Sequence, residues 1–294
     1  MRRAIGLLLV SACVALAAGC GEGAGEGSGG ARLEEGWRAY STGDFDVAVS
    51  VFEGVAAAPE ATAEDQYSAL LGLATTHHLR TNPDFPRARE SYERLGELET
   101  PDALRQSTLG LALVDLAEGT AGLEGRTNEG QARLMALLRD FPDDPIADEA
   151  VIHLAASLLE PMPDKAAPAG FSLPPSGREE RGANVLEQRL QTDPDNRLAP
   201  SMHIMLANHY KSIGQMREAV DHLIIAEKKG IAGVKTRSVV LWQIARIAEN
   251  ELKDYDLAAT YYERYAREFK RTTLFYRARE SLERVRALKA QEGA

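Results

Sequence analysis

The feature that most constrains the fold is a repeated spacing of small and large apolar residues that suits helical hairpins. One stretch shows it in full, with Leu206, Ala207, Tyr210, Gly214, Ala219, Leu223 and Ala226. Steps of three and four residues put these side chains on one face of each of two helices, which a turn at Gly214 separates. From Arg32 onward no segment shows the alternation that is typical of strands. We therefore predict an all-α chain.

The same frame returns along the chain with less fidelity, about every 40 residues. Its other members are Gly36, Gly43, Ala48, Phe52, Pro83, Phe85, Ala88, Tyr92, Leu95, Trp242, Ala258, Tyr262 and Tyr265. Small residues let paired helices approach, and large residues fill the gap between pairs. The pattern resembles the tetratricopeptide (TPR) repeat over residues 33–270. This resemblance implies an α-solenoid, and the alternative is a non-repeating helical bundle.

We expect about six TPR-like helical hairpins and a C-terminal capping helix at 273–291. The expected hairpins are 32–58, 62–98, 101–140, 144–192, 197–230 and 233–270. A capping side chain precedes a proline at Thr100–Pro101 and at Asp144–Pro145, which is typical of helix starts.

Residues 161–182 interrupt the fourth hairpin. They hold Pro161, Pro163, Pro168, Pro174 and Pro175. Because proline lacks an amide donor and breaks helices, we predict a long loop here. Two interpretations stay open. The loop is either a flexible insertion or a segment that docks on the solenoid or on a partner through Phe171 and Leu173.

The first twenty residues have the pattern of an export signal. Arg2 and Arg3 precede an uncharged, mostly apolar run of 15 residues at 4–18, shorter than the ~20 residues that span a bilayer. The run ends in Leu-Ala-Ala-Gly followed by Cys20, which resembles the lipobox of bacterial lipoproteins. The resemblance implies a signal peptide at 1–19 and a lipidated Cys20. The alternatives are an ordinary secretory signal and a core helix that ends in a cysteine.

The residues after the cysteine bear on location. Residues 20–31 are rich in glycine and predict a flexible tether. By the lipoprotein sorting rule, Gly21 in place of aspartate implies the outer membrane, with the protein facing the periplasm. The domain organisation that we expect is therefore signal peptide, tether and a helical solenoid at 32–294.

Charge is unevenly distributed. The chain has a net charge of −10, which argues against a nucleic-acid partner. Residues 233–294 nevertheless hold 13 basic and 9 acidic side chains. The cations concentrated near the C-terminus are Arg264, Arg267, Lys270, Arg271, Arg277, Arg279, Arg284, Arg286 and Lys289. They indicate either a landing face for anionic lipid or an acidic partner, or an ordinary charged helix surface.

Motifs of catalysis and metal binding are absent from the sequence. The six histidines are His77, His78, His153, His203, His209 and His222, and none has the spacing of a metal site. No nucleophile elbow, P-loop or dinucleotide-binding glycine pattern occurs. We expect no catalytic residue, no metal and no cofactor.

TPR arrays bind partners through the concave face that the first helix of each hairpin lines. By resemblance, the positions that face this groove are Trp37, Tyr40, His77, Arg80, Asn208, Lys211, Gln243 and Asn250. Ile204 stands where the lysine of a carboxylate clamp would be, so we do not predict capture of a peptide C-terminus.

Three hypotheses for function follow. The first is a lipid-anchored scaffold that holds envelope proteins or peptides in its groove, without catalysis. Residues 254–269 resemble the TPR lipoproteins of outer-membrane assembly and of the Tol system, although Lys270 stands where a proline is usual. The second is an accessory or catalytic lipoprotein with a site near the loop. The third is a structural spacer that self-associates through its last helix, so oligomeric state stays open.

Overall fold

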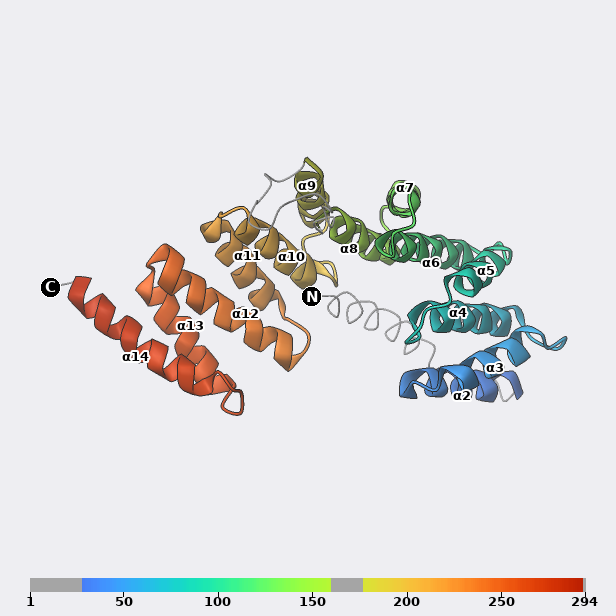
Figure 1. Cartoon of the computed structure of the whole chain (residues 1–294), viewed down its shortest axis with the longest axis horizontal. Coiled ribbons are helices and arrows are strands. Elements are labelled where there is room, and N and C mark those ends of the chain that lie inside the picture. Colours follow the sequence, from blue (N-terminus) through green and yellow to red (C-terminus); the bar gives the residue numbers. More distant parts are fainter. Residues whose placement is uncertain (1–27, 160–176, 293–294) are drawn as a thin grey trace. The chain divides into compact units, whose positions relative to one another are not determined.

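The computed structural model describes residues 28–159 and 177–292, and every regular element in them is helical (Figure 1). Thirteen α-helices and one short π-helix account for this structure. The chain divides into two compact units, one up to Ser157 and one from Leu158. The all-α prediction is confirmed for these residues.

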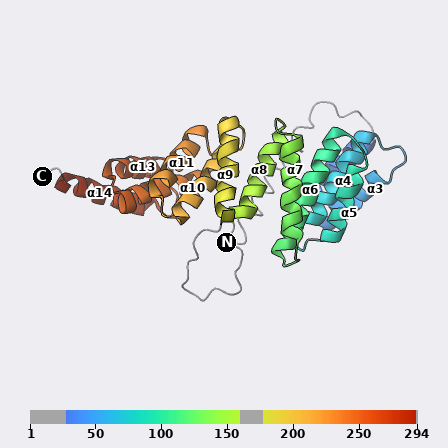
Figure 2. The ribbon, with the colours of Figure 1, turned by 90° about the horizontal axis from the view of Figure 1, so that it is seen from above.

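Unit 1 contains three complete helical hairpins and most of helix α8. Its helices are α2 (Ser28–Thr42), α3 (Phe45–Ala56), α4 (Ala63–Leu79), α5 (Phe85–Gly96), α6 (Pro101–Thr120), α7 (Arg126–Asp140) and α8 (Pro145–Leu159). Neighbouring helices pack in sequence from α2 to α7, and α4 also contacts both α2 and α6. Figure 2 shows α4, α6 and α7 side by side. Contact between first helices of successive hairpins is the stacking of a helical repeat.

Unit 2 continues the same alternation. Its helices are α9 (Gly177–Thr192), α10 (Ala199–Ser212), α11 (Met216–Lys229), α12 (Val234–Ile247), the π-helix η1 (Ala248–Leu252), α13 (Tyr255–Glu268) and α14 (Phe275–Glu292). Each α-helix from α9 to α14 packs on the next one along the chain. Six hairpins and a last helix were expected, and the helix boundaries agree with the expected ones within a few residues. The helices of the expected fourth hairpin, 144–192, are divided between the two units.

Helix starts follow local capping chemistry. The Thr100 side chain accepts a hydrogen bond from the Ala103 amide directly before Pro101. The Asp144 carboxylate accepts one from the Ile146 amide at 2.9 Å, where α8 begins. Both predicted starts are confirmed, because an oxygen acceptor satisfies amides that have no partner within the helix.

Two expected non-helical segments are partly helical. Helix α2 begins at Ser28, inside the stretch expected as tether, and α9 begins at Gly177, inside the stretch expected as loop. Residues 177–182 can be helical because the last proline is Pro175 and the side chains that follow are ordinary helix formers. The rest of the tether and of the loop lies outside the described residues.

Glycines make room for the largest core residue of unit 1. Phe52 on α3 is fully buried between α2 and α4. A Cβ at Gly36 would lie 2.7 Å from the Phe52 ring, and one at Gly72 would lie 2.6 Å from it. The ring therefore occupies the volume that two side chains would fill, and it joins the first hairpin to the second.

The core of unit 2 is aromatic. Tyr262 and Tyr265 on α13 are each 1% exposed, and both rings meet Trp242 of α12 edge to face. Ala245 and Ala258 are fully buried beside them. The small residues let α12 and α13 approach while the rings fill the remaining space, as the repeat pattern predicts.

The last helix caps the unit. In α14, Ala278 and Val285 are fully buried in the core of unit 2, whereas Arg279, Glu283 and Arg286 are exposed. One apolar stripe and one charged face are what a terminal helix of a repeat array needs. The predicted capping helix is confirmed.

The glycine at position 72 offers a test of this packing. We expect Gly72→Ala to lower the free energy of unfolding of unit 1 by roughly 1–3 kcal/mol, because the added methyl collides with the rigid Phe52 ring. Chemical denaturation followed by circular dichroism measures it. Gly54→Ala is the matched control on α3, since its methyl meets only the flexible end of Arg32 and should leave stability equal or raised. Equal losses in the two variants would contradict this account.

Candidate functional site

The groove positions predicted in unit 1 divide between core and surface. Tyr40 is 9% exposed and His77 is 2% exposed, so these two do not face an open groove as expected. Trp37 is half-buried, packs edge to face on Phe52 and donates from Nε1 to the Ser68 hydroxyl at 3.3 Å. The Tyr40 ring packs edge to face on Trp37 of α2 and on Phe45 of α3, so its own hairpin contributes to its burial.

Arg80 is the remaining candidate of unit 1 and stays accessible. It is half-buried at the end of α4 and forms an ion pair with Asp46 at 3.1 Å. A depression of about 170 Å³ lies beside this pair, lined also by Phe45 and Asn82. This volume is below the ~300 Å³ of ordinary ligand pockets, so the site suits a side chain of a partner better than a whole small molecule.

The groove positions predicted in unit 2 are accessible. Asn208 on α10 is exposed, and Lys211 one turn later is half-buried and donates from Nζ to the side-chain oxygen Oδ1 of Asn208 at 3.4 Å. Gln243 on α12 is half-buried, and Asn250 in the π-helix is exposed. Unit 2 therefore presents amides and one ammonium group on the first helices of its two complete hairpins. Such groups can donate to and accept from an extended peptide.

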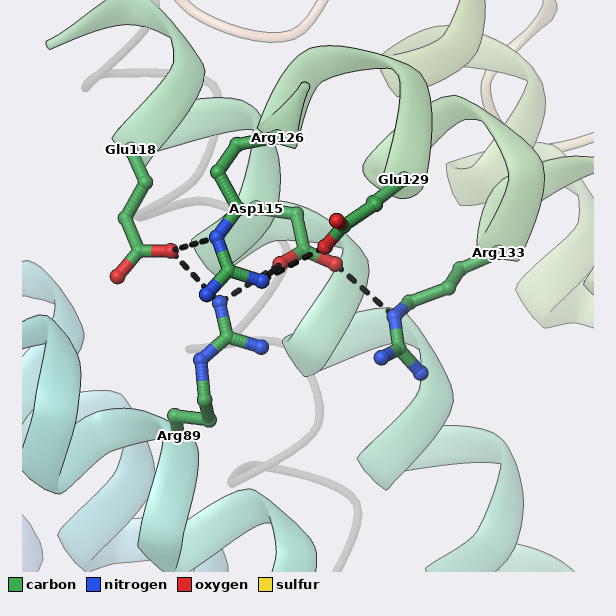
Figure 3. Close-up of polar contacts among 6 residues, drawn as sticks. All are labelled: Arg89, Asp115, Glu118, Arg126, Glu129 and Arg133. Atoms are coloured by element: carbon green, nitrogen blue, oxygen red, sulfur yellow. Dashed lines mark hydrogen bonds and ion pairs between the residues drawn. The ribbon is translucent and has the colours of Figure 1, made fainter. Parts of the chain in front are cut away.

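Sequence reasoning missed a buried ion network in unit 1 (Figure 3). Asp115 on α6 has a side chain with no exposed surface, and it receives Arg89 from α5 at 2.6 Å, Arg126 at 3.4 Å and Arg133 at 2.9 Å from α7. Glu118 binds Arg89 at 2.7 Å and Arg126 at 3.1 Å. Two carboxylates of one helix thus bind three guanidinium groups of its two neighbours.

The charges of the network balance and its members stabilise one another. Glu129 adds a third carboxylate, 2.6 Å from Arg126. Burial by itself would lower the pKa of Arg89, but hydrogen bonds to Asp115 and Glu118 outweigh it and raise that pKa. A sequence signal existed, since Asp115 and Glu118 are three residues apart and Asp115 follows the apolar run 109–114 of α6. Acids at that spacing on a buried face require basic partners.

Unit 2 contains two smaller networks of the same kind. Glu227 binds Arg264 at 2.5 Å and Arg237 at 3.4 Å, so it joins α11, α12 and α13. Burial would raise the pKa of Glu227, but these guanidinium groups lower it. Glu249 receives Arg284 of α14 at 2.7 Å and the Tyr262 hydroxyl at 2.7 Å. These pairs tie successive hairpins together where the apolar core ends.

Partial or full burial lowers the pKa of five of the six histidines, which are His77, His78, His153, His203 and His222. Burial lowers the pKa of His78 and of His153 to about 4, and the His153 ring further lowers the pKa of His78. In unit 2, His203 Nδ1 lies 2.9 Å from His222 Nδ1, so one ring donates and the other accepts. Burial, the His222 ring and Lys229 lower the pKa of His203 to about 4.

A tyrosine and a glutamate complete the histidine cluster of unit 2. The Tyr210 ring stacks on His222 with ring centroids 5.3 Å apart, and its hydroxyl donates to Glu187 of α9. That hydrogen bond, with burial, raises the pKa of Tyr210 to about 12. The cluster therefore holds α9, α10 and α11 together with neutral rings.

Residues 28–159 and 177–292 contain neither a metal site nor a membrane-spanning helix. No group of three or more His, Cys, Asp or Glu side chains there could hold a metal ion. No helix of that part is both long and apolar enough to cross a bilayer. Cys20, the expected signal peptide at 1–19 and most of the expected loop at 161–182 lie outside the described residues, so the signal peptide and lipidation stay predictions.

The sequence of one hairpin matches a known family. The tetratricopeptide repeat model matches residues 239–272, which contain most of α12, η1 and α13. The match covers this one hairpin, which is similar to a TPR, and TPRs typically hold protein partners.

Similarity beyond the single hairpin is limited. No curated protein matches the chain. Among solved structures, a monomeric mutant of IFIT1 with m7Gppp-AAAA matches 87% of this chain at 16% identity, with a TM-score of 0.40. The chain spans 55% of the length of that structure.

The buried network supports a prediction about stability. We expect Asp115→Ala to lower the free energy of unfolding of unit 1 by about 3 kcal/mol, because three arginines lose their shared partner. Urea denaturation measures this change. Glu34→Ala is the control, since its ion pair with Arg38 is exposed and such pairs contribute about 0–1 kcal/mol. A loss no larger than the control's would refute a stabilising role for the network.

The histidine cluster predicts a dependence on pH. Folding lowers the pKa of His203 to about 4 from its ordinary value of 6.5, so the unfolded chain binds more protons between these values. The free energy of unfolding should therefore fall as the pH drops from 6.5 to 4. We expect His203→Asn to reduce this slope, measured by urea denaturation at several pH values. Met202→Leu, a volume-conserving change at the adjacent buried position, should leave the slope as it is; an unchanged slope in both variants would exclude His203 as a cause.

Proposed function

We propose that the protein is a lipid-anchored, periplasm-facing scaffold that holds envelope proteins or peptides on the first helices of its repeats. The observation that carries this proposal is the TPR hairpin at 239–272. The outer-membrane location and the role in envelope assembly or maintenance rest on the sequence alone. They follow from the lipobox-like ending at Cys20 and from Gly21.

The surface of unit 2 suits an extended peptide better than that of unit 1. Asn208, Lys211, Gln243 and Asn250 are accessible there, whereas Tyr40 and His77 in unit 1 are buried. Amide side chains donate and accept at once, so they can bind peptide backbone without a fixed side-chain sequence. Partner selection therefore falls to α10 and α12.

A self-associating spacer has less support than the scaffold. End-to-end contact through α14 would bury its outward residues, among them Arg279, Glu283 and Arg286, all exposed. Burying those charges without partners is costly. A catalytic role near the loop has no observation in the described residues that favours it.

The proposed partner surface predicts a pattern of photo-crosslinks in the native cell. A photoreactive amino acid at Asn208 or Gln243 should crosslink to envelope proteins, because both side chains lie on first helices and reach the surface. The matched position is Thr260, which is exposed on the second helix α13. The same crosslinked proteins at all three positions, or none at Asn208 and Gln243, would contradict the scaffold.

The lipid anchor forms a separate arm of the same experiment. Cells grown with a labelled fatty acid should incorporate the label into the chain, and Cys20→Ser should abolish incorporation and release the protein from the membrane fraction. Cys13→Ser is the control, because Cys13 lies within the expected signal peptide. Label that survives Cys20→Ser would remove the anchor from the proposal and leave the scaffold untouched.

A further inference from the structure

The cations near the C-terminus fall into two groups. Five of the nine singled out in the sequence form ion pairs within unit 2. These are Arg264 with Glu227, Arg267 with Glu268, Arg284 with Glu249, Arg286 with Glu263, and Lys289 with Asp256. The other four are exposed and have no ion pair with any described residue, and they are Lys270, Arg271, Arg277 and Arg279.

The four unpaired cations lie together in the sequence and at one end of the unit. Lys270 and Arg271 are in the turn between α13 and α14, and Arg277 and Arg279 follow in the first residues of α14. Because the helices alternate in direction, the connection between α11 and α12 lies at this same end. The Arg237–Glu268 ion pair at 2.6 Å joins the start of α12 to the end of α13 and confirms it.

The α11–α12 connection adds two more unpaired cations. Lys228 at the end of α11 and Lys235 at the start of α12 are exposed, and neither has an ion pair with a described residue. The acids there are already engaged, since Glu227 and Glu268 bind arginines and Asp195 binds Lys229 at 2.6 Å. Glu280 in α14 offsets only one charge. We call the six unpaired cations and their surroundings the basic end.

The basic end also exposes large apolar side chains. Tyr276 is 78% exposed, Val234 is 75% exposed and Val239 is 45% exposed. The first two are the most exposed large apolar side chains of the described residues. They occupy the first residues of α14 and α12, the same elements that carry Arg277 and Lys235.

We propose that the basic end binds the surface of an anionic phospholipid membrane. Each cation near such a surface contributes roughly 1 kcal/mol, and tyrosine prefers the interface where its ring is apolar and its hydroxyl is hydrated. Long basic side chains can reach the headgroups while the apolar groups lie deeper. The inference does not depend on lipidation at Cys20.

A membrane fits this end better than an acidic protein does. Tyr276 and Val234 are largely exposed in the first residues of their helices, so they project from the surface. Protein interfaces bury their anchors in matching pockets, whereas a bilayer receives projecting groups without a preformed partner shape.

The test follows a fluorescent probe at the basic end of the full chain. Cys13→Ser and Cys20→Ser remove the native thiols, and Tyr276→Cys carries an environment-sensitive nitrobenzoxadiazole dye. A second variant carries the dye at Ser212→Cys instead. Ser212 is exposed and is the last residue of α10, at the end of unit 2 that lies opposite the basic end. Vesicles contain either phosphatidylcholine alone or about one third phosphatidylglycerol.

We expect the dye at position 276 to brighten and shift to the blue with phosphatidylglycerol, and the dye at position 212 to change little. The apolar run at 4–18 binds both kinds of vesicle, so only a difference between vesicles and between positions supports the proposal. Lys270→Gln with Arg277→Gln should raise the lipid concentration for half-response roughly 25-fold, about fivefold for each cation. The control pair Arg217→Gln with Arg246→Gln removes the same charge at the opposite end and should change it less than about twofold.

Three results would overturn the proposal. The first is no response at position 276, and the second is an equal response with phosphatidylcholine alone or at position 212. The third is a response to polyglutamate but not to phosphatidylglycerol vesicles, which would assign the basic end to an acidic polypeptide. None of these results bears on the crosslinks expected at Asn208 and Gln243, so the scaffold and the membrane contact fail separately.

Discussion

Burial of apolar side chains between hairpins is the interaction on which the rest of this structure depends. A single amphipathic hairpin leaves one face of each helix uncovered, and only the next hairpin can cover it. Phe52 shows how tightly this is done, since its ring fills the space above Gly36 and Gly72 on two different helices. Packing also buries Tyr40 and His77, so unit 1 exposes less groove surface than the repeat pattern predicts.

Ion pairs extend the packing where apolar contact ends. Asp115 joins α5, α6 and α7, Glu227 joins α11, α12 and α13, and Glu249 reaches α14. In each case an acid on one helix binds arginines of others, so a shift of one hairpin would leave a buried charge unpaired. Such contacts fix the register between helices more strictly than apolar groups do, because charged partners have defined geometry.

The sequence predicts helices here better than it predicts side-chain exposure. Capping residues and prolines act within a few residues, so the starts at Pro101 and Pro145 could be predicted directly. Exposure depends on which distant helix covers a position, and for that reason Asn208 was placed correctly on the surface while His77 was not. The glycine content also led to wrong predictions at the starts of two helices. Ser28–Gly30 and Gly177 are helical, although their composition is typical of loops. The ion network was missed because its partners come from three separate helices.

Charge pairing separates the structural cations of unit 2 from the cations that are available for binding. The sequence alone does not distinguish Arg264 from Arg277 as binding residues. In the structure, Arg264 binds Glu227 at 2.5 Å, whereas Arg277 has no ion pair with a described residue. Paired arginines have already exchanged water for carboxylates and gain little from another anion. Unpaired ones retain their full attraction, and their concentration at one end gives a chain of net charge −10 a locally positive surface. An acidic protein can therefore approach an anionic membrane at that end, with the amides of α10 and α12 left for a partner.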